Sequence, residues 1–275
     1  MIGTLYIVST PIGNLEDITY RAHRILQEVH IIAAEDTRHT QKLCSYYGIS
    51  TALTSYHDFN KEEKTSVLLE KLREGHSIAL VSDAGTPLIS DPGYYLLTRA
   101  IKEDIRVVPI PGPSAILTAL AASGLPTDAF RYEGFLPRKS TARIRILEAL
   151  AQESRTIILF ETPHRIKATL SEIQEIFGNR KLAIARELTK TYEEIIRGSA
   201  TEILTRCNSE NFRGEITLVI AGMPKPKKQP KKNMATTPHL LNQHPVTSPK
   251  WFLIQNSMPF IFHAFGNIFN RFSII

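Results

Sequence analysis

Short apolar runs alternate with amphipathic segments throughout the first 126 residues of this chain. The apolar runs lie at residues 4–9, 30–34, 52–56, 77–81 and 106–110, and helical patterns separate them at residues 17–28, 40–47, 61–74 and 93–102. In the first helical pattern Ile18, Ala22 and Ile25 recur at helical spacing, and Asp17 is expected to be the N-cap. Strands that alternate with helices pair in parallel through helical crossovers. The alternation therefore predicts an α/β domain with a mainly parallel sheet over residues 1–126.

Two of the predicted strands are followed by loops whose residues are typical of a ligand-binding site. Residues 79–93 read ALVSDAGTPLISDPG, so an apolar strand ends in Ser82 and Asp83, and residues 107–115 read VVPIPGPSA. Ligands of open parallel sheets lie beyond the carboxyl ends of the strands, and glycine and proline fix the shape of such loops. We expect the two junctions to face one crevice, although either alone is also what an ordinary strand-to-helix turn looks like.

A second domain is expected over residues 127–222. Gly124 and Pro126 interrupt the apolar pattern after a helix predicted at residues 114–123. Beyond them the patterns predict strands at residues 131–135, 156–160, 181–186, 193–197 and 215–221, with helices at 137–152, 163–177 and 200–206. Because the last strands follow one another closely, this sheet is expected to be mixed.

Residues 223–275 differ from the rest, and we expect a basic linker followed by a poorly ordered tail. This segment contains seven cationic residues and no acidic residue, so its net charge is +7. Because the whole chain has a net charge of +6, residues 1–222 have a net charge of −1. The overall basic charge is thus no argument that the folded body binds RNA.

The composition indicates a soluble, cytoplasmic protein without a membrane anchor. The amino terminus lacks a basic leader and a sustained apolar core, and no window is as long and apolar as a membrane helix requires. The two cysteines, Cys44 and Cys207, lie far apart, which argues against a disulfide framework and fits a reducing compartment. No cluster of side chains suggests a required metal.

Seven motifs carry a resemblance to a known family. The nucleotide-binding and hydrolase signatures GxGxxG, GxxxxGK, HExxH and GxSxG are absent. The motifs present are STPIGNLEDIT (residues 9–19), AEDTR (34–38), SDAGTPLISDPG (82–93), PGPSA (111–115), ETPHR (161–165), ARELTKTYEE (185–194) and RGE (213–215). Together, over residues 3–222, the chain resembles the small-subunit ribosomal RNA methyltransferase branch of the tetrapyrrole methylase superfamily.

The resemblance implies a two-domain α/β protein, usually a homodimer, that binds S-adenosylmethionine in a cleft and methylates the ribose 2′-hydroxyl of a decoding-site cytidine in 16S rRNA. Carried over by position, the cofactor contacts of the superfamily fall on Ile12, Asp83, Thr86, Ser114 and Ala115. Less directly, the strand ends near Phe160, Glu161 and Arg186 would close the pocket. The end of the chain, residues 234–275, departs from the pattern of the branch, and a frameshifted or replaced end is our hypothesis for it.

The chemistry of methyl transfer suggests further residues. A ribose hydroxyl is a weak nucleophile, so a proton acceptor close to it would help. The candidates are Glu35, Asp36, His57 and Glu161, each of which is as well suited to a structural ion pair. Guanidinium and ammonium groups suit phosphate oxygens, and the candidates for contacts with rRNA are Arg38, Arg165, Arg186 and Lys190.

Two other functions remain open from the sequence. A methylase of the same superfamily that acts on a precorrin or porphyrin fits the near-neutral body, whereas AEDTR and ARELTKTYEE count against it. A non-catalytic RNA binder in ribosome assembly would use the lysines beyond residue 222. Label from S-adenosylmethionine that appears on ribose, on a tetrapyrrole or on neither distinguishes the three.

Overall fold

The structure is a computed structural model, and it describes residues 1–209 and 212–224. The prediction for the tail falls almost wholly on residues 225–275, outside the described part. Within the described residues no helix is both long and apolar enough to cross a lipid bilayer. Cys44 and Cys207 are both buried and free of disulfides.

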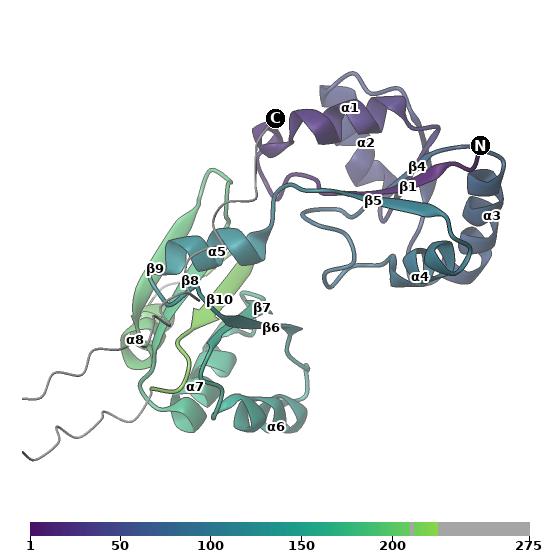
Figure 1. Cartoon of the computed structure of the whole chain (residues 1–275). Helices are drawn as coiled ribbons and strands as arrows, with labels where there is room; N and C mark the ends of the chain where they lie inside the picture. Colours follow the sequence, from purple (N-terminus) through teal and green to yellow (C-terminus); the bar gives the residue numbers. More distant parts are fainter. Residues whose placement is uncertain (210–211, 225–275) are drawn as a thin grey trace, which may run out of the picture. The chain divides into compact units, whose positions relative to one another are not determined.

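The first half of the chain forms a five-stranded sheet in the order β3-β2-β4-β1-β5, with every neighbouring pair parallel. Figure 1 labels β1, β4 and β5 of this sheet. Its strands are β1 (Thr4–Val8), β2 (Ile31–Ala34), β3 (Ala52–Ser55), β4 (Ile78–Val81) and β5 (Arg106–Ile110). The helices between them are α1 (Tyr20–Glu28), α2 (Thr37–Tyr46), α3 (Lys61–Arg73) and α4 (Tyr94–Lys102). The parallel alternation predicted from the sequence is confirmed.

Alternate residues of the central strands serve two separate cores. In β4, Ile78 and Leu80 pack in a cluster with residues of α3 and α4, whereas Ala79 and Val81 pack with residues of α1 and α2. A strand covered by helices on both faces has no solvent-facing side, which explains why β4 is apolar throughout. Because all five strands are parallel, the polar loops that follow them all emerge at one edge of the sheet.

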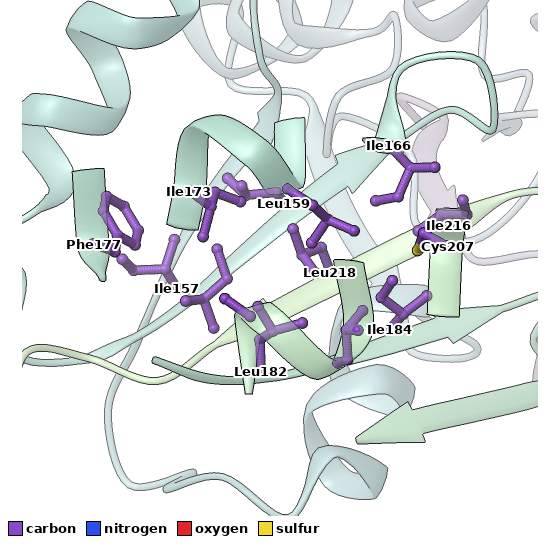
Figure 2. Packing of buried hydrophobic residues seen from close by; sticks show 14 of the residues in the cluster. Ile157, Leu159, Ile166, Ile173, Phe177, Leu182, Ile184, Cys207, Ile216 and Leu218 are labelled. Carbon is purple, nitrogen blue, oxygen red and sulfur yellow. The ribbon is translucent and has the colours of Figure 1, made fainter. Parts of the chain in front are cut away.

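The second half of the chain forms a mixed five-stranded sheet in the order β6-β7-β10-β8-β9, in which only β6 and β7 pair in parallel. Its strands are β6 (Phe130–Phe135), β7 (Thr156–Glu161), β8 (Lys181–Arg186), β9 (Glu194–Ser199) and β10 (Ile216–Ile220). The helices α6 (Ser140–Leu150), α7 (Ile166–Phe177) and α8 (Ala200–Ser209) contribute to one core with residues of this sheet. Figure 2 shows Ile166, Ile173 and Phe177 of α7 within this core, together with buried residues of β7, β8 and β10.

The helix α5 (Ala115–Ser123) packs on the second sheet. Ile116, Ala119 and Leu120 share a core with residues of β7, β8 and β10, among them Ile158 and Val219. The chain therefore leaves the first sheet at the end of β5, before the predicted boundary at residue 126. A division into residues 1–126 and 127–222 stays a prediction.

Four helices begin three residues away from their predicted starts: α6 and α7 begin at Ser140 and Ile166 instead of residues 137 and 163, and the starts of α1 and α2 have a clear cause. Asp17 is not the N-cap of α1 but ends a short 3-10 turn, Leu15–Asp17, and Thr19 caps the helix by accepting a hydrogen bond from the backbone N–H of Ala22 at 3.1 Å. The helix α2 begins at Thr37 instead of residue 40, because the side chain of Asp36 accepts from the N–H of Arg38 and caps it. Both differences follow from short polar side chains that satisfy free N–H groups at the helix ends.

Candidate active site

A cavity of about 280 Å³ lies beside the polar loops of the first sheet and the strand ends of the second. It is lined by Ile12, Ala84, Gly85, Thr86, Ile89, Ser90, Asp91, Ser114, Ala115, Ile116, Phe135, Phe160, Glu161, Thr162, Pro163, Gly214, Glu215, Ile216 and Thr217. These residues come from the loops after β1, β4 and β5, from the start of α5, and from the regions around β6, β7 and β10. We call this space the main cavity.

Hydrogen bonds hold the loops after β1 and β4 together at the floor of the main cavity. Thr10 and Gly85 exchange two backbone hydrogen bonds, of 2.9 and 3.0 Å. The hydroxyl of Thr10 donates to the carbonyl oxygen of Ser82 at 3.2 Å, and the hydroxyls of Ser9 and Thr86 lie 2.9 Å apart. Polar residues that follow two separate strands thus fix each other's loops. The loop after β4 also contacts the PGPSA loop, because the hydroxyl of Thr86 donates to the carbonyl oxygen of Pro113 at 3.4 Å.

Two glycines allow the loops of this floor to pack closely. A Cβ atom on Gly112 would lie 2.9 Å from the Cβ atom of Ser9, so any larger residue would push the PGPSA loop away from the first strand. Gly85 has a φ of +77°, in the left-handed region that glycine tolerates. Gly85 lines the main cavity, and Gly112 lets the PGPSA loop pack closely against Ser9.

The motifs STPIGN and ARELTK meet next to this floor. The backbone N–H of Asn14 donates to the hydroxyl of Thr189 at 3.0 Å. A Cβ atom on Gly13 would lie 2.5 Å from the Cγ atom of Lys190 and 2.9 Å from the carbonyl oxygen of Leu188. One role of the ARELTK motif is therefore to pack against the first loop of the chain.

Four of the five predicted cofactor residues line the main cavity: Ile12, Thr86, Ser114 and Ala115. Ser114 is the N-cap of α5, so the first turn of that helix opens toward the cavity. Asp83 does not line the cavity. Its carboxylate accepts a hydrogen bond from the backbone N–H of Asp36 at 3.0 Å, which ties the loop after β4 to the loop after β2.

The predicted proton acceptors occupy three different places. Glu35 and Asp36 lie next to Asp83, at the ends of β2 and β4. Burial and the neighbouring Asp83 raise the pKa of Glu35, whereas hydrogen bonds from Arg38 lower the pKa of Asp36. His57 lies in the loop after β3, where its backbone N–H donates to the side chain of Asn60 at 2.9 Å. None of these three lines the main cavity.

Glu161 does line the main cavity, but its carboxylate already has partners. One oxygen accepts from the backbone N–H of Thr162 at 2.8 Å, and the other accepts from the hydroxyl of Thr169 at 2.6 Å. The guanidinium of Arg165 lies 3.4 Å away. The residue is 3% exposed, so these bonds are what make a buried carboxylate tolerable at this position. This arrangement favours the structural interpretation of Glu161.

Each of the four predicted RNA contacts is engaged by an acidic side chain. Arg38 pairs with Asp36 at 2.6 Å, Arg165 with Glu161 at 3.4 Å, and Arg186 with Glu194 at 2.7 Å. Lys190 lies 3.0 Å from Glu187 and 3.1 Å from Glu215. Contact of these four side chains with RNA stays a prediction.

The sequence analysis assigned no role to Asp91, which lines the main cavity. Burial, with smaller contributions from Glu35 and Asp83, raises its pKa from 3.8 to about 6, although the nearby hydroxyl of Ser82 acts in the opposite direction. Its neighbours Leu88 and Ser90 have φ angles of +78° and +67°, so the loop reaches Asp91 through a strained backbone. The signal in the sequence was the second acidic residue of SDAGTPLISDPG, directly before Pro-Gly.

The lining of the main cavity suits a nucleoside cofactor. Apolar walls formed by Ile12, Ile116 and Phe160 can cover a flat base, while polar backbone and hydroxyl groups lie at the floor. Among the described residues, no group of three or more His, Cys, Asp and Glu side chains could hold a metal ion.

Comparison with known proteins agrees with this geometry. The sequence model of the family Tetrapyrrole (Corrin/Porphyrin) Methylases matches residues 4–204. A protein of Halalkalibacterium halodurans named ribosomal RNA small subunit methyltransferase I is 53% identical over 220 residues, which cover 80% of this chain and 76% of that protein. A protein of the same name from Escherichia coli O157:H7 is 52% identical over 223 residues, 80% of this chain and 78% of its own length.

Solved structures share the fold at low identity. A cobalt precorrin-4 methyltransferase is 19% identical with a TM-score of 0.61, covering 79% of this chain and 94% of its own. Uroporphyrin-III C-methyltransferase from Thermus thermophilus, solved in complex with S-adenosylhomocysteine, is 16% identical with a TM-score of 0.57, covering 80% of this chain and 97% of its own.

Proposed function

This chain belongs to the tetrapyrrole (corrin/porphyrin) methylase family, and we propose that it methylates the ribose 2′-hydroxyl of a decoding-site cytidine in 16S rRNA. Its activity is methylation of small-subunit ribosomal RNA with S-adenosylmethionine as the methyl donor. The observation that carries the activity is the 53% and 52% identity, over four fifths of the chain, to relatives named ribosomal RNA small subunit methyltransferase I. The ribose and the cytidine are the finer part, and they rest on the resemblance of the motifs.

The main cavity supplies the groups that such a cofactor needs. S-adenosylmethionine, when bound, provides a methyl group on a positively charged sulfur. We propose that Ile12 and Ile116 cover the adenine, and that Thr86, Ser114 and Ala115 hold the polar edges of the cofactor. The small residues Gly85 and Gly112 leave room at the floor, where a Cβ atom would already contact Ile12 or Ser9.

We further propose that Asp91 accepts the proton of the ribose hydroxyl. Three carboxylates line the main cavity, but Glu161 is bonded to Thr162 and Thr169, and Glu215 pairs with Lys190. Asp91 faces no cation among the described residues. A carboxylate with a pKa near 6 is a stronger base than an ordinary one, and it is still ionised at neutral pH. Its negative charge also suits a cavity that receives a cationic sulfur.

Alignment provides the other part of the rate enhancement. Methyl transfer requires the acceptor oxygen to approach opposite the sulfur, so fixing both partners in one cavity replaces a rare encounter. The hydrogen bonds among Ser9, Thr10, Gly85 and Thr86 keep the floor rigid for this purpose. The hydroxyls of Ser90 and Tyr132, 2.7 Å apart, hold the Asp91 loop against β6.

Transfer of tritium from S-adenosylmethionine to small ribosomal subunits tests the proposal. Subunits from a strain that lacks this activity should accept one methyl group each, and digestion to nucleosides should recover it as 2′-O-methylcytidine. Label on a base would contradict the ribose assignment, and label on a tetrapyrrole precursor instead of rRNA would contradict the RNA substrate.

We also propose that the protein acts as a homodimer in the cytoplasm. The support is the resemblance to the family, together with a ribosomal substrate. Light scattering of the purified full chain should give twice the mass of 30.9 kDa, and a mass of one chain would contradict the dimer.

A further inference from the structure

A second cavity adjoins the main cavity at Pro163. Its volume is about 290 Å³, and besides Pro163 it is lined by His164, Ile166, Lys167, Phe212 and Arg213. Pro163 lines both cavities, and Gly214, which directly follows Arg213, lines the main one. We call this space the basic cavity. A nucleotide whose ribose enters the main cavity would therefore have its neighbouring backbone close to the basic cavity.

The polar side chains of the basic cavity are cationic or able to become so. His164, Lys167 and Arg213 are all exposed, and no ion pair joins any of them to a described acidic residue. The apolar wall is rigid by comparison, because Ile166 is fully buried and Phe212 is 7% exposed. The basic cavity thus combines an apolar floor with two permanent positive charges at its rim.

The cations of the basic cavity differ in their partners from the four cations that the sequence predicted as RNA contacts. A guanidinium that already pairs with a carboxylate, as Arg38 does with Asp36, must give up that partner before it binds a phosphate. Lys167 and Arg213 have no such partner among the described residues to give up. Phosphate contacts supply most of the affinity of proteins for nucleic acids, and the planar fork of arginine suits phosphate oxygens.

We propose that the basic cavity binds a backbone phosphate of the RNA substrate, next to the nucleotide that enters the main cavity. The inference rests on the proposed function, since it names the groups that hold the same RNA. Lys167 and Arg213 provide the charge, and His164 adds a hydrogen-bond donor.

The test compares two double variants of the full chain. K167A/R213A removes both permanent charges of the basic cavity, and R21A/K102A removes two exposed cations of the first half that line neither cavity. With small subunits as substrate, we expect the KM of K167A/R213A to rise about tenfold or more and its salt dependence to fall by about one to two in the log–log slope. Its kcat and its affinity for S-adenosylhomocysteine should stay within about twofold of wild type, because neither Lys167 nor Arg213 lines the main cavity.

Several results would overturn the inference. Equal KM values and salt slopes for K167A/R213A and R21A/K102A would show that the basic cavity does not bind RNA. A loss of affinity for S-adenosylhomocysteine in K167A/R213A alone would assign the cavity to the cofactor. If about 20 mM inorganic phosphate protected K167A/R213A and wild type equally against heat, the basic cavity would contain no phosphate site. Failure of wild type to methylate small subunits would instead refute the proposed function.

Discussion

Replacing Asp91 with asparagine should stabilise the protein and inactivate it at the same time. Asparagine keeps the size of the side chain and a partner for Ser82, but it removes the charge. In the folded protein burial raises the pKa of Asp91 from 3.8 to about 6. Such a carboxyl favours the folded state when it is protonated, and this contribution is lost as the pH rises from about 4 through about 6.

The size of the effect follows from that shift. One pKa unit corresponds to about 1.4 kcal/mol, so keeping Asp91 ionised costs the folded protein about 3 kcal/mol at pH 8. The D91N variant avoids this cost. For a chain of this length we expect its unfolding temperature at pH 8 to lie about 6 to 12 °C above that of wild type. At pH 4 the free-energy difference should shrink to about 0.5 kcal/mol, because Asp91 is then protonated in the folded protein, and ionisation in the unfolded chain, where its pKa is 3.8, has only begun to favour unfolding.

Activity should move in the opposite direction. Loss of a proton acceptor lowers kcat about 100-fold or more. In wild type kcat/KM should rise with pH through about 6, and in D91N this rise should disappear. Thermal unfolding at pH 4 and pH 8 and single-turnover methylation across the same range measure both effects, with D128N, at an exposed site outside the main cavity, as control. A D91N variant that is fully active, or one that is no more stable than D128N at pH 8, would refute this account of the site.

Three further predictions concern the floor, the second sheet and the predicted RNA contacts. The G112A variant should bind S-adenosylhomocysteine at least about tenfold more weakly by calorimetry, because its new Cβ atom would meet that of Ser9 at 2.9 Å; affinity equal to wild type would argue against the cofactor site. The E161Q variant should lose about 1 to 3 kcal/mol of stability by weakening its bonds to Thr162 and Thr169, with kcat of the folded fraction nearly unchanged; a stable but inactive variant would restore Glu161 as a proton acceptor. R186A should lower the unfolding temperature through the loss of its pair with Glu194 more than it raises the KM for small subunits, and the reverse order would support its predicted contact with RNA.

The pattern of apolar residues was enough to predict both sheets. Each strand of the first sheet lies within or close to its predicted range, and the central strand β4, which is buried throughout, is also apolar throughout. The helix starts were less certain. Whether Asp17 or Thr19 caps α1 depends on a 3-10 turn that Asn14 begins, and two residues of capping type only two positions apart cannot be told apart in a sequence.

The candidate site was predicted in part. Four predicted residues line the main cavity: Ile12, Thr86, Ser114 and Ala115. They follow parallel strands, and the carboxyl ends of parallel strands lie at one edge of a sheet, where ligands bind in open sheets of this kind. Charge partners could not be predicted in this way. Arg186 and Glu194 lie on neighbouring strands, and their contact depends on the register of β8 and β9.

The sequence by itself determined the family, the two sheets and the loops that line the main cavity, because periodicity and local turn chemistry act over short stretches of chain. Tertiary structure alone decided which charged groups are free to act. It places Asp91 half-buried in the main cavity, pairs Glu161 with Thr169, and brings Lys167 and Arg213 together from distant segments. The physical reason is that pKa and ion pairing depend on distance and burial in space, and a sequence records neither.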